Sequence, residues 1–232
     1  MFYETGALKE AAMYDWNFNV IWDYRMVYLK GASITMQLSL LAVLFSMSLG
    51  LFVGIARQSK RHFLSFPASC YVEIFRDTPL LIQIVWIFYC LPILLGITLT
   101  AFWASTVALS LHMSAYVAEI FRAGIASVDK GHVDAARILG LNYFQIMTRI
   151  ILPQAIRRML PPLVNNFADI LKLSALASVI GVYELLHSVD NVIMNNFRPL
   201  EMYSVLAMVY FILIFPVAFF ARRAEIYLAH RI

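Results

Sequence analysis

The sequence predicts an all-α membrane protein with five transmembrane helices, its N-terminus outside the cell and its C-terminus in the cytoplasm. Hydrophobic residues make up 62% of the chain and charged residues only 14%, whereas soluble domains contain about 25% charged residues. The apolar residues fall into long stretches, and Lys and Arg gather in the segments between them. Because basic loops stay in the cytoplasm, they give the orientation. The net charge of +4 therefore reflects membrane topology and does not predict a nucleic-acid partner.

Residues 1–30 are predicted to form a polar N-terminal arm on the extracytoplasmic side. They mix acids, bases and aromatic residues, and they lack the basic start and apolar core of a signal peptide. Trp and Tyr are favoured at the depth of the lipid headgroups, and the arm has four that fit this position: Trp16, Trp22, Tyr24 and Tyr28. Residues 31–232 then form the transmembrane domain.

Span one covers about residues 31–56. No charged residue lies between Lys30 and Arg57, and this length crosses a hydrocarbon core of ~30 Å with some tilt. Gly50 and Gly54, together with several serines, give the span a small-residue face suited to close helix packing. Three basic residues follow at once and place this end in the cytoplasm: Arg57, Lys60 and Arg61.

Span two covers about residues 80–95, with Pro92 bending its far end. Thr78 is expected to cap this helix, with Pro79 at its first position. Residues 62–76 mix apolar and charged side chains, which predicts either an amphipathic cytoplasmic segment or the first turns of the same helix.

Spans three, four and five cover about residues 101–121, 161–182 and 202–221. Glu119 and Arg122, three residues apart at the cytoplasmic end of span three, can form an ion pair. Basic residues after span five hold the C-terminus inside: Arg222, Arg223 and Arg231.

Between spans three and four, residues 128–153 predict two short cytoplasmic helices that meet at an angle. Ala135 and Ala136 favour helix and are small enough for a partner's backbone to come close. Gly131 precedes the first helix, and Gly140 can end it in the left-handed conformation.

The second of these helices has its own start and end signals. Asn142 is expected to cap it, and Pro153 is expected to break or kink it. The run of bases around residues 128–153 places both helices in the cytoplasm.

Span four contains polar residues that are unusual at membrane depth. Asn165, Asp169 and Lys172 fall on one helical stripe, and with His112 of span three and Ser174 they are the candidate residues of a substrate path. An intramembrane charge is costly unless it faces water or a partner. The alternatives are a structural Asp169–Lys172 ion pair at a helix interface and, for His112, a hydrogen bond to a neighbouring helix.

The stretch Asp134–Pro153, DAARILGLNYFQIMTRIILP, resembles the EAA loop of permeases from ATP-binding-cassette (ABC) importers, E-A-A-x3-G-x9-I-x-L-P. Every fixed position matches, with Asp134 in place of the glutamate. Two further segments resemble the polar amino-acid branch of that family, the histidine, arginine, glutamine and opine permeases. FRDTPLLIQ at residues 75–83 is similar to F-R-G-T-P-L-L-V-Q, and AYVAEIFRAGI at residues 115–125 is similar to A-Y-x-A-E-I-x-R-G-G-I.

The resemblance implies the five-helix core of a type I ABC importer permease in the inner membrane, surrounded by lipid. Its partners would be an ATPase dimer, a second and non-identical permease subunit, and an extracytoplasmic binding protein that delivers an amino acid or a related polar solute. The loop would couple to the ATPase through one set of residues: Asp134, Ala135, Ala136, Leu139, Gly140 and Leu141. The chain has no G-x4-G-K-[ST] phosphate loop. ATP and Mg²⁺ would therefore bind to the ATPase, and this subunit would be no enzyme and would need neither cofactor nor metal.

Three positions depart from the amino-acid branch. Its usual K-D-T-S-L reads KLSAL at residues 172–176, its usual span-three Asn is His112, and the G-Q before its EAA box is Gly131-His132. Hydroxyl and carboxyl groups would hold the ammonium group of an amino acid. In KLSAL the lysine and one hydroxyl, that of Ser174, remain, while the acid and the other hydroxyl are absent. This loss implies either that the non-identical partner holds most of the site or that the solute is not an ordinary amino acid.

Two other classes of membrane protein fit the sequence less well than an importer permease. A secondary transporter, or a channel subunit for small polar solutes, is the alternative function; transporters of that class often have two related halves, and no internal repeat is visible here. A membrane-embedded enzyme would need paired carboxylates or a metal-binding motif in a span, and the sequence contains neither.

Overall fold

The computed structural model describes residues 14–59 and 61–229, with side chains through residue 223. Residues 1–13 of the predicted arm and Arg231 lie outside these ranges. Within them every regular element is a helix. In chain order the elements are α2 (Asn19–Asp23), α3 (Arg25–Arg57), α4 (His62–Asp77), α5 (Leu80–Leu95), α6 (Ala101–Ala126), α7 (Lys130–Ile138), α8 (Tyr143–Ile146), the π-helix η1 (Met147–Ile151), α9 (Leu152–Leu173), the 3-10 helix η2 (Ser174–Ile180), α10 (Leu185–Asn196) and α11 (Pro199–Ala229).

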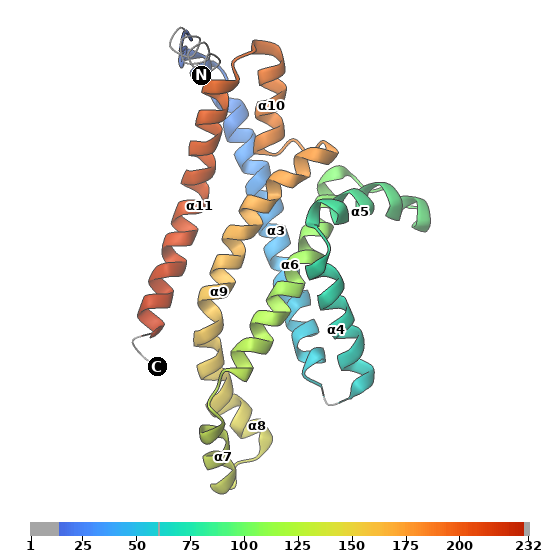
Figure 1. Ribbon diagram of the computed structural model, residues 1–232, viewed down its shortest axis with the longest axis vertical. Coiled ribbons are helices and arrows are strands. Elements are labelled where there is room, and N and C mark those ends of the chain that lie inside the picture. Colours follow the sequence, from blue (N-terminus) through green and yellow to red (C-terminus); the bar gives the residue numbers. More distant parts are fainter. Residues whose placement is uncertain (1–13, 60, 230–232) are drawn as a thin grey trace, which may run out of the picture.

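Four long helices, α3, α6, α9 and α11, run along the long axis of the molecule (Figure 1). α4 lies beside them, and α5 turns away from α4 through 105°. The short helices α7 and α8 form a knuckle at one end, while α10 and the start of α3 lie at the other. The start of α3 and the end of α11 thus lie toward opposite ends, as an odd number of membrane crossings requires.

Several helices are long and apolar enough to cross a membrane. Three helical runs pass this test alone, Arg25–Arg57, Tyr143–Ile180 and Pro199–Arg223, and α4 with α5 passes only as a bent pair. α6 has 26 residues, a length of ~39 Å, and its serines and His112 are buried among the other helices. The fold is therefore a membrane-spanning helical bundle, and the count of five crossings stays a prediction.

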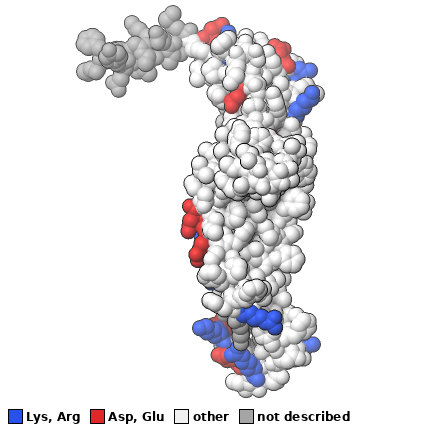
Figure 2. Space-filling view, turned by 90° about the vertical axis from the view of Figure 1, so that its right-hand side faces the viewer, with Lys and Arg blue, Asp and Glu red and all other residues white. Residues whose placement is uncertain are grey.

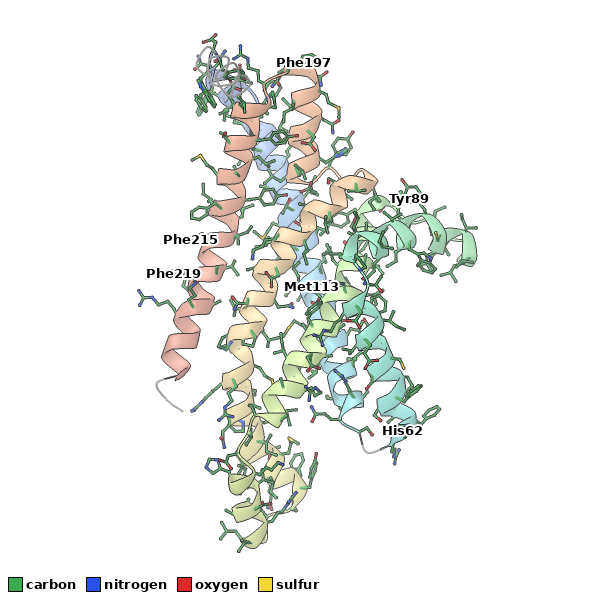
Figure 3. The ribbon with its side chains drawn as sticks, viewed as in Figure 1. His62, Tyr89, Met113, Phe197, Phe215 and Phe219 are labelled. Carbon is green, nitrogen blue, oxygen red and sulfur yellow. The ribbon has the colours of Figure 1, made fainter. Side chains whose placement is uncertain are left out.

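The distribution of charge fits a bilayer. On the face drawn in Figure 2, Lys, Arg, Asp and Glu gather near the two ends, and the broad band between them is nearly free of charge except for acidic groups along one edge. Large apolar side chains are exposed along α11, among them Met208, Phe211, Ile212, Phe215 and Phe220. The stacked rings of Phe215 and Phe219 can be followed on this helix in Figure 3. Such a surface suits lipid or another membrane subunit rather than water.

The most extensive helix contact joins α3 and α6. It is lined by small buried residues, including Ser46 and Gly50 on α3 and Ala104 and Ala108 on α6. A Cβ atom at Gly50 would lie 2.5 Å from Cγ1 of Val117, so only glycine fits there. This confirms the predicted small-residue face of span one, which lets two backbones approach closely.

Apolar side chains fill two main clusters. One joins α3, α5, α6 and α9 and includes Leu38, Ile84, Leu109 and Ile170. The other, toward the α10 end, joins α3, α10 and α11 and includes Tyr28, Leu185, Val189 and Met202. Together they hold the long helices at fixed positions around α3.

The region of span two differs from its prediction. Residues 62–77 form a helix of their own, α4, and α5 has the predicted bounds but runs at a steep angle to it. Thr78 does not cap α5, because its hydroxyl donates to the carbonyl of Ile74 in the last turn of α4 over 2.7 Å. Pro79 sits at the N-cap instead of the first helical position. The helix stops there because proline disfavours a helical conformation in the residue before it.

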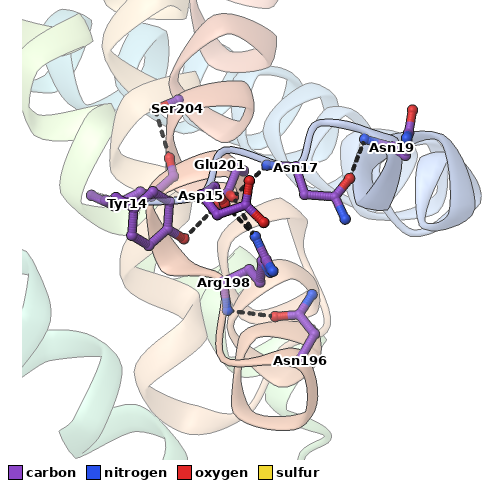
Figure 4. A network of polar contacts seen from close by, with 9 residues as sticks. Tyr14, Asp15, Asn17, Asn19, Asn196, Arg198, Glu201 and Ser204 are labelled. Carbon is purple, nitrogen blue, oxygen red and sulfur yellow. Dashed lines mark hydrogen bonds and ion pairs between the residues drawn. The ribbon is translucent and has the colours of Figure 1, made fainter. Parts of the chain in front are cut away.

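A polar network fastens the described part of the arm to the start of α11 (Figure 4). The fully buried carboxylate of Glu201 accepts hydrogen bonds from Tyr14 Oη at 2.6 Å and from the N–H of Asn17 at 3.0 Å. Arg198 forms an ion pair with Glu201 at 3.2 Å and donates to the carbonyl of Asp15 at 2.7 Å. The hydrogen bond that Tyr14 donates to Glu201 raises the pKa of the Tyr14 phenol.

A second buried carboxylate, Glu184, holds α10 against α3 and α11. It accepts hydrogen bonds from the N–H of His187 at 2.9 Å and from Tyr210 Oη at 2.8 Å. The hydroxyl of Thr35 lies 3.4 Å from the same carboxylate and accepts from the N–H of Leu185 at 3.1 Å. Each polar group in this junction has a protein partner, which a buried site of low dielectric requires.

The predicted topology can be tested by cysteine labelling. Single cysteines at Ser59 and Asn195, in a chain without Cys70 and Cys90, should react with a membrane-impermeant thiol reagent from opposite sides, Ser59 from the cytoplasm and Asn195 from outside. The basic residues beside Ser59 are the physical reason. The cysteine-free chain serves as the control, and labelling of both positions from one side would contradict the five-span topology.

Candidate functional site

The knuckle is defined as residues 128–153. Its first helix, α7, has a capping hydrogen bond at its start and a left-handed glycine after its end. The Asp129 side chain accepts a hydrogen bond from the N–H of Gly131 at 2.6 Å, so Gly131 lies in the first turn of α7 and not before it as predicted. Gly140 has φ +77°, and the N–H of Leu141 donates back to the last turn of α7 over 3.1 Å. The predicted left-handed closure at Gly140 is confirmed.

The second helix of the knuckle starts with a reciprocal cap. Asn142 Oδ1 accepts from the N–H of Gln145 at 2.9 Å, and Gln145 Oε1 accepts from the N–H of Asn142 at 3.0 Å, so the predicted cap is confirmed. Of the two predictions for Pro153, a break or a kink, the break is wrong, because the chain stays helical through η1 into α9; the kink stays a prediction. The π turn before Pro153 shifts the hydrogen-bond register at the position where proline has no N–H.

The tip of the knuckle exposes large apolar side chains. Four such residues are at least 74% exposed: Ile138, Leu139, Tyr143 and Phe144. The knuckle lies at one end of the molecule (Figure 1), and the sequence around it contains the bases predicted to be cytoplasmic. An apolar patch of this kind outside lipid indicates a protein partner.

The predicted coupling residues divide between the surface and the interior of the knuckle. Ala135, Leu139 and Gly140 are exposed, and Leu141 is half-buried. Asp134 is exposed and pairs with Arg137 at 3.0 Å. Ala136 is only 2% exposed, so it packs within this chain and is not on the free surface.

The two long helices that lead into and out of the knuckle, α6 and α9, are fastened to each other at its base. The guanidinium of Arg158 in α9 donates to the carbonyl of Ser127 at the end of α6. Met159 packs so closely on Gly124 that a Cβ atom there would lie 2.3 Å from its Cγ. A displacement of the knuckle would therefore move the adjacent ends of α6 and α9 with it.

A polar pocket lies on the exposed side of the bundle between the end of α4, α6 and α9. Its volume is about 240 Å³, and it is lined by Arg76, Tyr116, Glu119, Ile120, Pro162, Asn165, Asn166 and Asp169. Two of these residues, Asn165 and Asp169, belong to the stripe predicted from the sequence. Arg76, Tyr116 and Asn166 were not predicted as path residues.

Comparison with known proteins identifies the family. The model of the family described as "Binding-protein-dependent transport system inner membrane component" matches residues 31–225. The chain belongs to this family. It is a permease subunit of an importer in the inner membrane, and ATP is hydrolysed by a separate ATPase subunit.

Relatives of this permease include proteins from several bacteria. The putative glutamine transport system permease protein GlnP of Rickettsia bellii (strain RML369-C) is 38% identical over 196 residues, which cover 84% of this chain and 90% of the relative. The glutamine transport system permease protein GlnP of Escherichia coli (strain K12) is 34% identical over 213 residues, which cover 91% and 96%.

Solved structures agree with this assignment. A crystal structure of an amino acid ABC transporter with histidines superposes with a TM-score of 0.85 at 37% identity, covering 90% of this chain and 100% of that one. The MetNI methionine ABC transporter, in an inward-facing conformation, has a TM-score of 0.74 at 20% identity, covering 89% and 98%, and it shows the shared fold alone.

The permease neutralises one acid of the pocket with two arginines. Glu119 pairs with Arg122, as predicted, and also with Arg57 at the end of α3. The second pairing was not predicted, because the two residues are far apart in sequence. It ties the C-terminal parts of α3 and α6 together and leaves Glu119 with little net charge to offer a solute.

The other predicted path residues lie apart from the pocket lining. Lys172 is exposed and pairs with Asp169 at 3.0 Å, so this ion pair is accessible rather than buried at a helix interface. Ser174 is buried and donates to the carbonyl of Leu171 in its own helix. His112 is buried, with its ring 5.2 Å from that of Tyr116, and its Nδ1 has no hydrogen-bond partner among the described residues. No group of three or more His, Cys, Asp or Glu side chains among the described residues could hold a metal ion.

Gln83 holds the bend that brings the end of α4 toward the pocket. Its amide nitrogen donates to the carbonyls of Phe75 at 2.9 Å and Thr78 at 3.0 Å, across the break between α4 and α5. Gln83 is 7% exposed, so water does not readily replace it. Phe75 directly precedes Arg76, and the clamp therefore fixes the backbone beside a pocket residue.

Replacing Gln83 should destabilise the permease. Gln83→Leu leaves two carbonyls without this donor, and an unsatisfied buried polar group costs about 1–3 kcal/mol. The thermal unfolding midpoint of the purified transporter in detergent should fall. Gln37→Leu is the matched control, because Gln37 is exposed and its amide donates only to Ser33. Equal midpoints for Gln83→Leu and the unmodified chain would show that Gln83 does not hold the bend.

Proposed function

We propose that this permease forms, with a second and non-identical permease subunit, the membrane path for a polar amino acid, glutamine being the first candidate. An extracytoplasmic binding protein delivers the solute, and an ATPase dimer that binds ATP and Mg²⁺ drives transport. The glutamine permeases among the relatives support this solute. The observation that carries the proposal is the polar pocket, which sets charged and amide groups on a surface that otherwise suits lipid.

The path runs along the exposed stripe of α9. Asn165, Asp169 and Lys172 lie on one face of that helix, and all three are exposed in the single subunit. A charged pair on a membrane helix must face water or protein rather than lipid. The stripe therefore faces the space between the two permease subunits, where an aqueous route can form.

The knuckle is the surface that docks on the ATPase. Ile138, Leu139, Tyr143 and Phe144 supply the apolar anchor, and Asp134, Ala135, Gly140 and Leu141 border it. When the ATPase dimer closes on ATP, it moves the knuckle, and the attached ends of α6 and α9 rock with it. The buried Ala136 supports this surface from inside.

The second subunit covers an exposed membrane surface of this chain. α11 exposes aromatic and aliphatic side chains along its length, and lipid and the partner divide this surface between them. A non-identical partner is supported by the KLSAL sequence at residues 172–176, because the partner can supply the acid and hydroxyl groups that this chain lacks.

The first test of this proposal concerns coupling. Gly140→Leu should weaken the docking of the ATPase, because a left-handed backbone costs residues other than glycine about 1–2 kcal/mol. A Cβ atom at Gly140 meets nothing within 4 Å, so the strain comes from the backbone and not from crowding within the subunit. The measurement is the yield of ATPase that co-purifies with the tagged permease, together with solute uptake into vesicles.

Gly140→Asn is the control for this variant, since asparagine tolerates the left-handed region better than leucine. It should retain more of the ATPase than Gly140→Leu. Normal co-purification and uptake with leucine at this position would refute the docking role of the knuckle.

The second test concerns the path. Lys172→Ala should reduce glutamine uptake and weaken the stimulation of ATP hydrolysis by the loaded binding protein, because it removes a charge from the route while assembly stays intact. Lys30→Ala, at the opposite end of the bundle, is the control. Unchanged uptake and stimulation with Lys172→Ala would mean that the Asp169–Lys172 pair is not part of the route.

A further inference from the structure

We propose that Arg76 binds the α-carboxylate of the solute, and that the polar pocket is a two-point site for a zwitterionic α-amino acid. This inference rests on the proposed function, which supplies the solute class. It goes beyond that function by assigning the residues that bind the α-carboxylate and the ammonium group, which all α-amino acids share. It starts from a cation that the described protein leaves without an acidic partner.

Arg76 is exposed and lies roughly 21 Å along α4 from the start of that helix at His62. This places its guanidinium in the pocket that Glu119 of α6 also lines. No acid among the described residues forms an ion pair with it, whereas Glu119 and Asp169, the acids of the same pocket, are paired with other bases. A charged side chain on a membrane protein must face water or a partner, and a guanidinium that lines a pocket without an acidic partner can bind an anion from outside the chain.

Arg76 is also held in place without being neutralised. Its guanidinium carbon lies 5.4 Å from the ring centroid of Tyr116, and such stacking orients the guanidinium plane while its N–H groups stay free. The Gln83 clamp fixes the backbone one residue earlier. A planar donor in a fixed orientation matches a carboxylate, which it can bind through two parallel hydrogen bonds.

The opposite wall of the pocket provides acceptors for an ammonium group. Asp169 presents a carboxylate that Lys172 only partly neutralises, since both side chains are more than half exposed. Asn166 also lines the pocket. Most of the residue is buried, but its amide group is not among the buried polar groups without a partner and therefore reaches the open space of the pocket. Its carbonyl oxygen can accept from an ammonium group there.

A cation and hydrogen-bond acceptors thus line one cavity. They are complementary to an α-amino acid, whose carboxylate would bind the cation and whose ammonium group would bind the acceptors. The side chain of the amino acid would extend beyond this pair of contacts. The site would then recognise the amino-acid class through its common end, and the second subunit would select among side chains. This explains how the chain can bind solute although the KLSAL segment lacks the usual acid.

Binding of amino acids and their α-amides tests the assignment directly. The purified transporter, with partner subunit and ATPase, is placed in lipid nanodiscs without the binding protein. L-glutamine, L-histidine and L-arginine are each compared with the corresponding α-carboxamide by calorimetric titration. The unmodified transporter should prefer at least one acid to its amide by about tenfold or more, because hydrogen bonds to a charged group are worth that much.

Arg76→Gln should abolish this preference, because it should weaken binding of the amino acid and leave binding of the α-carboxamide nearly unchanged. Arg76→Lys should keep only part of it, since an ammonium group lacks the planar fork, and it serves as the second variant if Arg76→Gln fails to assemble. Arg223→Gln is the matched control: Arg223 is exposed and stacks on Phe219 at 5.2 Å, but it lies at the far end of α11. It should keep the full preference.

Three results would overturn the proposal. If Arg76→Gln keeps the acid–amide ratio, the anion at Arg76 is a lipid phosphate or an acid of the second subunit. If Arg76→Gln weakens binding of the amino acid and of its α-carboxamide equally, Arg76 has only a structural role. If the unmodified transporter binds none of the six compounds, the amino-acid function itself fails, and the assignment of Arg76 fails with it.

Discussion

The close contact between α3 and α6 determines where the other helices of this permease can lie. In lipid there is little hydrophobic force between helices, and association depends on packing and polar contacts. Gly50 lets the two backbones meet, with Val117 filling the space that a side chain would need. α4 and α9 then pack against both members of this pair. The two sides of the polar pocket are therefore held by elements that share one support.

Charge is distributed in this bundle according to what can neutralise it. Glu119 sits between two arginines and joins the C-terminal part of α3 to that of α6. Glu184 and Glu201 are fully buried, but each accepts hydrogen bonds from the protein: Glu184 from α10 and α11, and Glu201 from the segment that precedes α2. These three acids are structural, because their partners lie within the chain. Arg76 differs in that no acid among the described residues forms an ion pair with it, and both Arg76 and Asn166 line the pocket, where a ligand can reach them.

The features that could be predicted from the sequence are those set by local or compositional signals. The membrane class follows from composition, the closure at Gly140 from the absence of a Cβ atom, and the cap at Asn142 from the glutamine three residues later. Features that depend on distant residues could not be predicted. The bend after α4 needs Gln83 to satisfy carbonyls across the break, and the continuity through Pro153 needs a π turn. For Arg76, the missing information was that α4 ends beside α6 and α9.

The pocket and the knuckle are connected through α6 and α9. Tyr116 and Asp169, which line the pocket, lie on the helices that meet the knuckle at Ser127 and Arg158. The two helices pack without space between Gly124 and Met159, and close-packed interiors shift as units rather than deform. If the ATPase moves the knuckle as proposed, the spacing between the wall of α9 and Arg76 on α4 should change, because the described part of α4 packs on α3 and α6 and touches α9 little. A two-point site divided between two helices that shift relative to each other would hold an amino acid in one state of the cycle and release it in the other.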